Sequence, residues 1–279
     1  MVLRLSHKDR NFEAGFRALL AMKREVSEDV DQAVRAIIED VRARGDAAVI
    51  AALLKGGADA NEKLPLGRRP LMLAARSGQV DAVRALIEHG ADVNARLTAL
   101  PPYRAKLDRG NDTMFQAGTT ALLRAAKAAD LPAIELLIEH GADARLGTNR
   151  VGITPLLAAA GVGTNESDST GRQKTQADAI GALKIFLDHG VDVNSPDNNG
   201  RTALHGAALQ GYNDVIRFLA TKGASLDAKD NKGFTPLDVA LGKAGGFGFA
   251  GSEGVRREAT ADLIRRLVSG TSEDKTAAR

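Results

Sequence analysis

The sequence contains no cysteine and no tryptophan, and it has only two tyrosines and eight phenylalanines in 279 residues. Without cysteine it can form neither a disulfide framework nor a thiolate nucleophile. No stretch approaches the roughly 18 apolar residues of a membrane-spanning helix, so no membrane contact is expected. Residues 1–10 also lack the apolar run of a secretory signal. Cysteine usage leaves the compartment open, whereas the lack of a signal and of a membrane-spanning run predicts a cytoplasmic protein.

The apolar residues that are present are mostly alanine, leucine, isoleucine and valine, in a chain that is 44% hydrophobic. Small and straight-chain residues favour closely packed helices over strands, so an all-α fold is expected. Lysine and arginine number 38 against 35 aspartates and glutamates, which gives a formal charge of +3. An excess this small, spread along the chain, does not predict a nucleic-acid partner.

A Gly-Ala-Asp-like phrase recurs through the chain, at intervals of 33, 51, 49 and 33 residues. Its first glycines are Gly57, Gly90, Gly141, Gly190 and Gly223. Thr-Pro-Leu-like starts lie at Pro70, Ala121, Pro155, Ala203 and Pro236, and the first four precede Gly90, Gly141, Gly190 and Gly223. From Pro70, Ala121 and Ala203 the next of these phrase glycines follows after 20 residues. This recurrence predicts a repeat protein.

Each unit reads as a first helix, a glycine turn, a second helix and an extended return, most clearly over residues 202–229. Thr202 is placed to cap the first helix, Gly211 to make the turn and Gly223 to end the second helix in a left-handed conformation. The second helix carries an apolar stripe of Val215, Ile216, Phe218 and Leu219. One such pair cannot bury its apolar face alone, so the units are expected to stack.

The pattern resembles the ankyrin repeat over roughly residues 45–270. The resemblance is carried by Thr154-Pro155-Leu156, Thr202-Ala203-Leu204-His205, Thr235-Pro236-Leu237, Gly90-Ala91-Asp92-Val93-Asn94 and Gly190-Val191-Asp192-Val193-Asn194. It implies an all-α solenoid of antiparallel helix pairs with hairpin fingers along one edge, and a role in binding proteins. We expect repeats over 46–270, an N-terminal helical cap over 1–45 and a disordered tail over 271–279.

Three repeats are longer than the others. About 18 extra residues around Leu97 to Phe115 enlarge one finger, about 15 follow Gly163, and 14 lie in the last repeat. Long insertions are often functional loops or disordered segments. The enlarged finger and the terminal glycine-rich loop together resemble a group of bacterial ankyrin proteins that are often exported, although this chain lacks their export signal.

The N-terminal residues, 2 to about 49, depart from the repeat. Two amphipathic stripes, one with Phe12 and Phe16 and one with Ile37 and Ile38, predict two helices that shield the first repeat. The stretch from Lys23 to Asp46 is similar to the start of histidinol dehydrogenase, a zinc- and NAD-dependent enzyme. Only its first helices are represented, so the resemblance implies no activity. The chain is then a natural or engineered fusion.

The remaining candidates for chemistry have structural explanations. His89, His140 and His189 each precede a glycine that ends a second helix, where the helix dipole favours a cation. His205 occupies a turn position, where a stabilising hydrogen bond is expected. The run 246–251 matches a dinucleotide fingerprint literally, but a helix precedes it where a strand is required. We therefore predict no catalytic residue, no cofactor and no metal.

Binding residues are expected in the enlarged finger, which Pro101 and Pro102 stiffen. Aromatic and arginine anchors carry much of the energy of protein interfaces. The candidates are Tyr103, Arg104, Lys106, Arg109, Met114 and Phe115. Met114 and Phe115 could instead fold back onto the next repeat, and Tyr212 is a weaker candidate elsewhere.

The sequence therefore predicts a non-enzymatic module that binds a protein partner through its concave face and enlarged finger. It is expected to be a monomer or a weak homodimer through the N-terminal helices. The alternatives are a nucleic-acid-binding protein, a fusion or scaffold without a selected partner, and an inactive remnant of the zinc- and NAD-dependent dehydrogenase.

Overall fold

The computed structural model describes residues 46–64, 67–98, 117–163, 174–243 and 256–270. It divides into two compact units, Met1–Ala58 and Asp59–Arg279, which are considered separately. Over the described ranges every regular element is a helix, and no strand occurs there. The predicted N-terminal cap helices and the C-terminal tail lie outside the described residues.

The first unit is described from helix α2, Asp46–Lys55. The helix ends in a turn in which Gly57 has a φ of 93° and Ala58 N donates to Leu53 O at 3.0 Å. A left-handed glycine one or two residues beyond the last helical residue is a common way to end a helix. The Gly-Ala-Asp phrase thus acts as a helix stop, as the sequence predicts.

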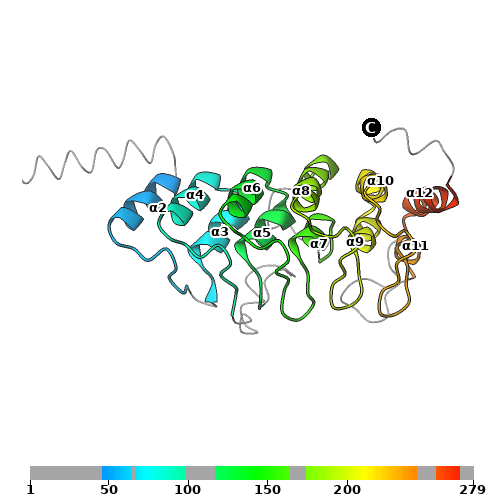
Figure 1. The fold of residues 1–279 in the computed structure, drawn as a ribbon, viewed down its shortest axis with the longest axis horizontal. Helices are drawn as coiled ribbons and strands as arrows, with labels where there is room; N and C mark the ends of the chain where they lie inside the picture. Colours follow the sequence, from blue (N-terminus) through cyan, green and yellow to red (C-terminus); the bar gives the residue numbers. More distant parts are fainter. Residues whose placement is uncertain (1–45, 65–66, 99–116, 164–173, 244–255, 271–279) are drawn as a thin grey trace, which may run out of the picture. The chain divides into compact units, whose positions relative to one another are not determined.

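The second unit is a series of helix pairs (Figure 1). The first helices of the pairs are α3 Pro70–Ser77, α5 Ala121–Ala128, α7 Pro155–Ala159, α9 Ala203–Gln210 and α11 Pro236–Ala240. The second helices are α4 Val80–Glu88, α6 Leu131–Glu139, α8 Gln176–Asp188, α10 Asn213–Thr221 and α12 Glu258–Ser269. First helices pack on first helices and second helices on second helices along the series. The expected solenoid of helix-turn-helix units is confirmed.

Local sequence explains where the first helices begin and end. The side chains of Thr120 and Thr154 accept hydrogen bonds from the third backbone N–H of α5 and α7, satisfying a donor that the helix cannot satisfy itself. The turns to the second helices pass through left-handed residues, Gly78 at φ 69° and Gly211 at φ 72°. Ala129 holds the same conformation at φ 50° without being a glycine.

Paired alanines make the close stacking possible. Ala125 and Ala126 of α5 and Ala207 and Ala208 of α9 are all fully buried. Side chains this small let neighbouring first helices approach closely, and the larger residues of the second helices fill the remaining volume. Ile134, Leu137, Leu183, Phe186, Ile216 and Leu219 are the main examples, all fully buried.

The structure places the three insertions at specific points of the repeat. The first lies between α4 and α5, in a finger. The second lies between α7 and α8, and the third between α11 and α12, in each case between the two helices of one pair. Most residues of each insertion lie outside the described ranges, but their points of attachment do not.

Candidate functional site

The fingers are the turns that precede the first helices, and three of them are described in full: residues 148–153, 197–201 and 230–234. In each, the first side chain caps the turn. Asp197 Oδ1 accepts from Asn199 N and Arg201 N, both at 2.9 Å. Thr148 Oγ1 accepts from Ile153 N at 3.1 Å. The acceptor oxygens at the fingertips therefore face inward.

Each finger is joined to the one before it by a backbone hydrogen bond. Asn198 N donates to Val151 O at 2.8 Å, and Asn231 N donates to Asn199 O at 2.9 Å. Asn149 N makes the same bond to Ala117 O, at 2.8 Å, in the enlarged finger. The tips from residue 117 to residue 234 therefore form one connected series, which we call the finger row.

The finger row requires glycine at one position in each turn. A Cβ there would lie 2.5–2.6 Å from an atom of the asparagine in the next finger, which is closer than a Cβ can approach. The φ angles are also positive, between 74° and 90°. The positions are Gly118, Gly152 and Gly200. Gly233 in the last described finger has nothing within 4 Å of its Cβ position.

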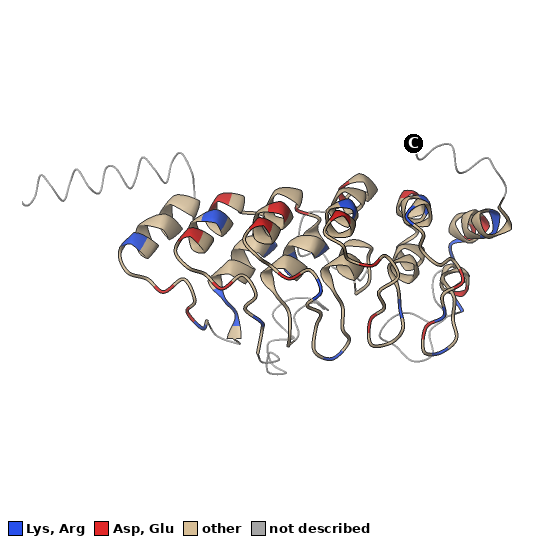
Figure 2. Ribbon diagram, viewed as in Figure 1, with Lys and Arg blue, Asp and Glu red and all other residues tan. Residues whose placement is uncertain are grey.

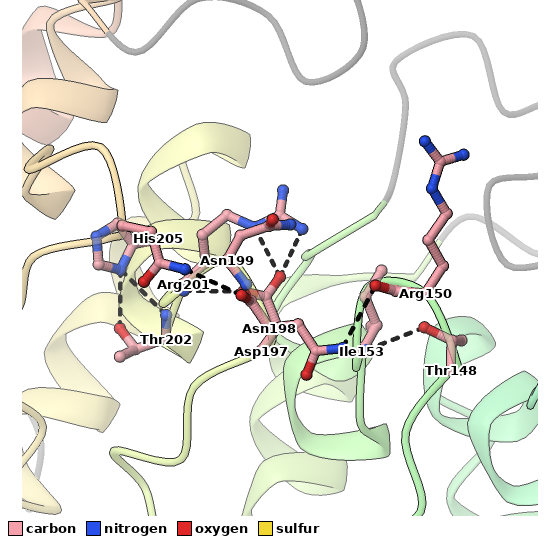
Figure 3. A network of polar contacts seen from close by, with 10 residues as sticks. Thr148, Arg150, Ile153, Asp197, Asn198, Asn199, Arg201, Thr202 and His205 are labelled. Carbon is pink, nitrogen blue, oxygen red and sulfur yellow. Dashed lines mark hydrogen bonds and ion pairs between the residues drawn. The ribbon is translucent and has the colours of Figure 1, made fainter.

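We call the residue after each linking asparagine the outward position of its finger. These residues are Arg150, Asn199 and Lys232, and all three are exposed. Figure 3 shows the Arg150 side chain extending away from the hydrogen-bonded network. Among the described residues, no ion pair or side-chain hydrogen bond engages the charged groups of Arg150 and Lys232. The row thus presents one unengaged side chain per finger.

A buried ion pair closes one finger, between its first residue, Asp197, and its last, Arg201. Arg201 Nη2 lies 2.5 Å and Nε 2.7 Å from Asp197 Oδ2, and the two side chains are only 9% and 0% exposed (Figure 3). Because Asp197 also caps the turn, each of its oxygens is bonded. A buried charge pair of this kind fixes geometry and is costly to break on one side.

His205 links this finger to the next one. Its Nδ1 accepts from Thr202 N at 3.1 Å, so in the neutral tautomer Nε2 donates to Phe234 O at 3.0 Å. Burial lowers the pKa of His205, which favours this neutral form despite the hydrogen bond to the Phe234 carbonyl and the charge of Asp230. The predicted turn-stabilising hydrogen bond is confirmed.

A second set of links joins the loops after the second helices. Each asparagine here donates from Nδ2 to a glycine carbonyl of the next repeat and accepts at Oδ1 from a backbone N–H two residues later. The members are Asn61 with Gly90 and Asp92, Asn94 with Gly141 and Asp143, and Asn194 with Gly223 and Ser225. Arg145 replaces asparagine in one repeat and only donates, to Gly190 O at 3.3 Å.

The three histidines at the ends of second helices have the predicted structural role. The Nδ1 atoms of His89, His140 and His189 each lie 2.8 Å from the carbonyl oxygen four residues earlier. All three are the C-cap residues of their helices. In the described part of the chain no group of three potential ligands is arranged to hold a metal.

Lys174 makes a capping contact that the sequence does not predict. Its ammonium group reaches back from the start of α8 to the end of α7, where it donates to Ala158 O at 2.9 Å and Ala159 O at 3.0 Å. Burial, followed by the charge of Lys127, lowers the pKa of Lys174 to about 7. No motif marks this lysine, because the carbonyls it caps lie 15 and 16 residues earlier in the sequence.

The six residues predicted to bind a partner, from Tyr103 to Phe115, lie outside the described residues. The base of their finger is described: Leu97 N donates to Thr119 O and Gly118 N to Leu97 O, both at 2.8 Å. Arg96 Nη2 ties this base to the next finger by donating to Gly147 O and to Asn149 Oδ1, each at 2.7 Å. The enlarged finger therefore starts and ends at a fixed base within the finger row.

Two further candidates differ in their placement. Tyr212 is the half-buried N-cap residue of α10, and burial raises the pKa of its hydroxyl. Its side chain is therefore partly packed inside the fold and only partly accessible to a partner. The dinucleotide-like run 246–251 lies outside the described residues.

Charge is distributed unevenly between the two helix layers (Figure 2). Among the first helices, α3, α5, α7 and α9 contain no aspartate or glutamate and contribute Arg76, the buried Arg124 and Lys127, whereas α11 contains Asp238. Among the second helices, α4, α6 and α8 carry six carboxylates and two cations, whereas α10 and α12 carry equal numbers of each. The carboxylates are Asp81, Glu88, Glu135, Glu139, Asp178 and Asp188, and the cations are Arg84 and Lys184.

Comparison with known proteins gives matches to two kinds of protein. The family model described as ankyrin repeats in three copies matches residues 37–101 and 175–246. SH3 and multiple ankyrin repeat domains protein 2 of Homo sapiens is 28% identical over 236 residues, 77% of this chain and 12% of that protein. Neurogenic locus notch homolog protein 1 of Homo sapiens is 30% identical over 197 residues, 69% of this chain and 6% of that protein.

The second kind of match is short. Histidinol dehydrogenase of Rhizobium meliloti (strain 1021) is 63% identical over 49 residues, which are 18% of this chain and 11% of the enzyme. The chain therefore spans about an eighth or less of the length of each of these three relatives. None of the described helices has both the length and the apolar character needed to cross a bilayer.

Proposed function

Because this chain carries ankyrin repeats, we propose that it is a non-enzymatic protein-interaction module whose finger row and first helices contact the partner. The finger row is the observation that supports this proposal most strongly. Backbone bonds between successive fingers fix the backbone beside Arg150, Asn199 and Lys232 before any partner binds. Binding then requires little further ordering of the backbone, which reduces its entropic cost.

The enlarged finger is the second part of the proposed surface. Its predicted residues include the aromatic side chains Tyr103 and Phe115 together with arginines and a lysine, the types that contribute most at interfaces. The two-way hydrogen bonding of Leu97 with residues 118 and 119 supports this placement, since it fixes where the segment leaves the repeat. Met114 and Phe115 could instead pack on the chain itself.

We further propose that the histidinol-dehydrogenase-like segment has no catalytic role and serves as a helical cap or a weak dimer contact. The match covers 11% of that enzyme, and residues 37–101 and 175–246 of this chain match the ankyrin-repeat model. A cytoplasmic location is part of the same proposal. If the purified full chain retained stoichiometric zinc or bound NAD tightly, the non-enzymatic assignment would fail.

The proposed function is tested by capturing partners from a bacterial lysate with the full chain and with a variant that lacks residues 98–114. A control variant lacks residues 165–172, an insertion placed between two helices of one pair. Circular dichroism must show equal helix content for all three. Loss of a captured protein from the first variant alone supports the enlarged finger as part of the binding surface, whereas retention by both removes it from the proposal. Capture of no protein by the full chain would contradict the function itself.

A further inference from the structure

At the fingertips the carboxylates bond within their own turns, whereas the cations are exposed. Asp197 and Asp230 turn inward, because their Oδ1 atoms accept backbone N–H groups of their own turns at 2.9 Å. Asp197 is also neutralised by Arg201. Arg150 and Lys232 occupy the outward position and are exposed. The outward face of the row is therefore positive, although its turns contain both signs.

The neighbouring first helices add charge of the same sign. Arg76 and Lys127 lie on α3 and α5, and helices α3, α5, α7 and α9 contain no aspartate or glutamate, whereas Arg124 is buried and α11 contains Asp238. Lys174 lies close enough for the charge of Lys127 to lower its pKa. The second helices α4, α6 and α8 carry six carboxylates against two cations, whereas α10 and α12 carry equal numbers of each. An acidic ligand is thus favoured at the fingers over the surface of α4, α6 and α8.

From this arrangement we infer that the finger row binds an extended acidic segment of a partner protein, with carboxylates on Arg150 and Lys232 and a polar residue on Asn199. The inference rests on the proposed function and specifies its partner. Amides suit a peptide because they can both donate to and accept from a backbone. Arginine at position 150 can bind a carboxylate with two parallel hydrogen bonds.

The repeat also sets the spacing of the acidic residues. Packed helices lie roughly 8–10 Å apart, and an extended chain advances about 3.3 Å per residue. One finger therefore corresponds to about three residues of an extended peptide. Because Arg150 and Lys232 are two fingers apart, their carboxylate partners are expected about six residues apart.

A peptide fits this surface better than a nucleic acid does. The outward positions alternate cation, amide and cation, whereas a nucleic acid presents a continuous line of phosphates. Single strands also require aromatic side chains on which bases stack, and none of the three outward positions is aromatic. A nucleic acid therefore enters the test as a competing outcome.

The test selects binders to the immobilised full chain from a phage library of random dodecapeptides. The selected peptides are then synthesised, and their affinities are measured by fluorescence anisotropy. Four charge variants are compared with the parent chain. Arg150→Glu with Lys232→Glu reverses the row, and Arg84→Glu with Lys184→Glu makes the same charge change on second helices. Asn199→Lys and Asn199→Asp alter the central position alone.

The expected result is enrichment of aspartate and glutamate at a spacing of about six residues. Binding should weaken about tenfold or more in the reversed row and change little in the second-helix control. Asn199→Lys should strengthen binding and Asn199→Asp should weaken it, each by a few fold.

Three outcomes would overturn the inference. Selection of peptides without acidic residues, or of peptides whose binding is insensitive to the row variants, would contradict an acidic partner. The proposed protein-binding function would still hold. Tighter binding of a duplex or single-stranded DNA probe through Arg150 and Lys232 would replace the peptide by a nucleic acid. The absence of any selected binder would count against both this inference and the proposed function.

Discussion

Gly200 lies directly beneath Asn231 of the next finger, so that a Cβ added at residue 200 would stand 2.6 Å from Asn231 Oδ1 and 2.9 Å from Asn231 N. The same contact recurs two repeats earlier, where a Cβ at Gly118 would lie 2.5 Å from Asn149 N. The requirement for glycine in the fingers thus comes from the neighbouring finger as well as from the positive φ of the turn.

Replacing Gly200 by alanine should therefore cost more stability than replacing Gly233. Both residues have positive φ, 78° and 84°, which makes alanine unfavourable by about 1 kcal/mol at either position. Only residue 200 adds a steric conflict, which we expect to lower the free energy of unfolding by about 1–3 kcal/mol more. Urea unfolding of the two variants measures the difference. Equal losses would show that Asn231 can move aside at little cost.

Arg145→Asn should stabilise the repeat. The guanidinium can donate to Gly190 O but cannot accept, so among the described residues the N–H of Asp192 lacks the side-chain acceptor that asparagine supplies in other repeats. Restoring that bond should raise the free energy of unfolding by about 0.5–1.5 kcal/mol. The reverse change, Asn94→Arg, should lower it. A thermal melt of both variants checks the prediction, which fails if the two shift in the same direction.

Lys174 should make stability rise with pH above neutrality. Its pKa is about 7 in the folded chain and 10.5 in an unfolded one, so between these values the unfolded chain binds more protons. Unfolding then becomes less favourable as pH rises, by at most about 1.4 kcal/mol per pH unit. Below pH 7 the buried lysine is charged in both states and its full cost is present.

The change Lys174→Met should remove this gain in melting temperature from about pH 7 to about pH 9. Lys184→Met is the matched control, because Lys184 is exposed on α8, the helix that Lys174 precedes. The control should keep the gain. If Lys174→Met keeps it as well, the lysine has an ordinary pKa in the folded chain.

His205 should also make the stability of the folded chain increase with pH, in a range below that of Lys174. Burial lowers its pKa below the ordinary 6.5, so in the window beneath 6.5 the unfolded chain takes up a proton before the folded chain does. Stability therefore falls as pH drops from 6.5 toward the lowered value. His205→Gln should flatten this part of the profile, since glutamine does not titrate. Melting temperatures from about pH 7 to about pH 5 measure the effect. An unchanged slope would assign the acid sensitivity to other groups.

Much of this architecture could be predicted from the sequence because it depends on local chemistry. Thr154 before a proline and Gly211 after a paired alanine mark helix boundaries through capping and φ preference, which act within a few residues. The C-cap positions of His89, His140 and His189 follow from the same short-range pattern. The positions of the insertions follow from arithmetic on the repeat. The six predicted binding residues stay a prediction, since they lie outside the described residues.

The sequence by itself determined the helix pairs, their order and the fact that they stack, because a fixed period and an amphipathic pattern are contained in the chain. Only the tertiary structure decided which polar groups meet. The contact of Gly200 with Asn231, the capping of α7 by Lys174 and the outward direction of Arg150 each depend on residues brought together by stacking or by the return of the chain. Hydrogen bonding depends on distances in space, and separation along the sequence does not specify these distances.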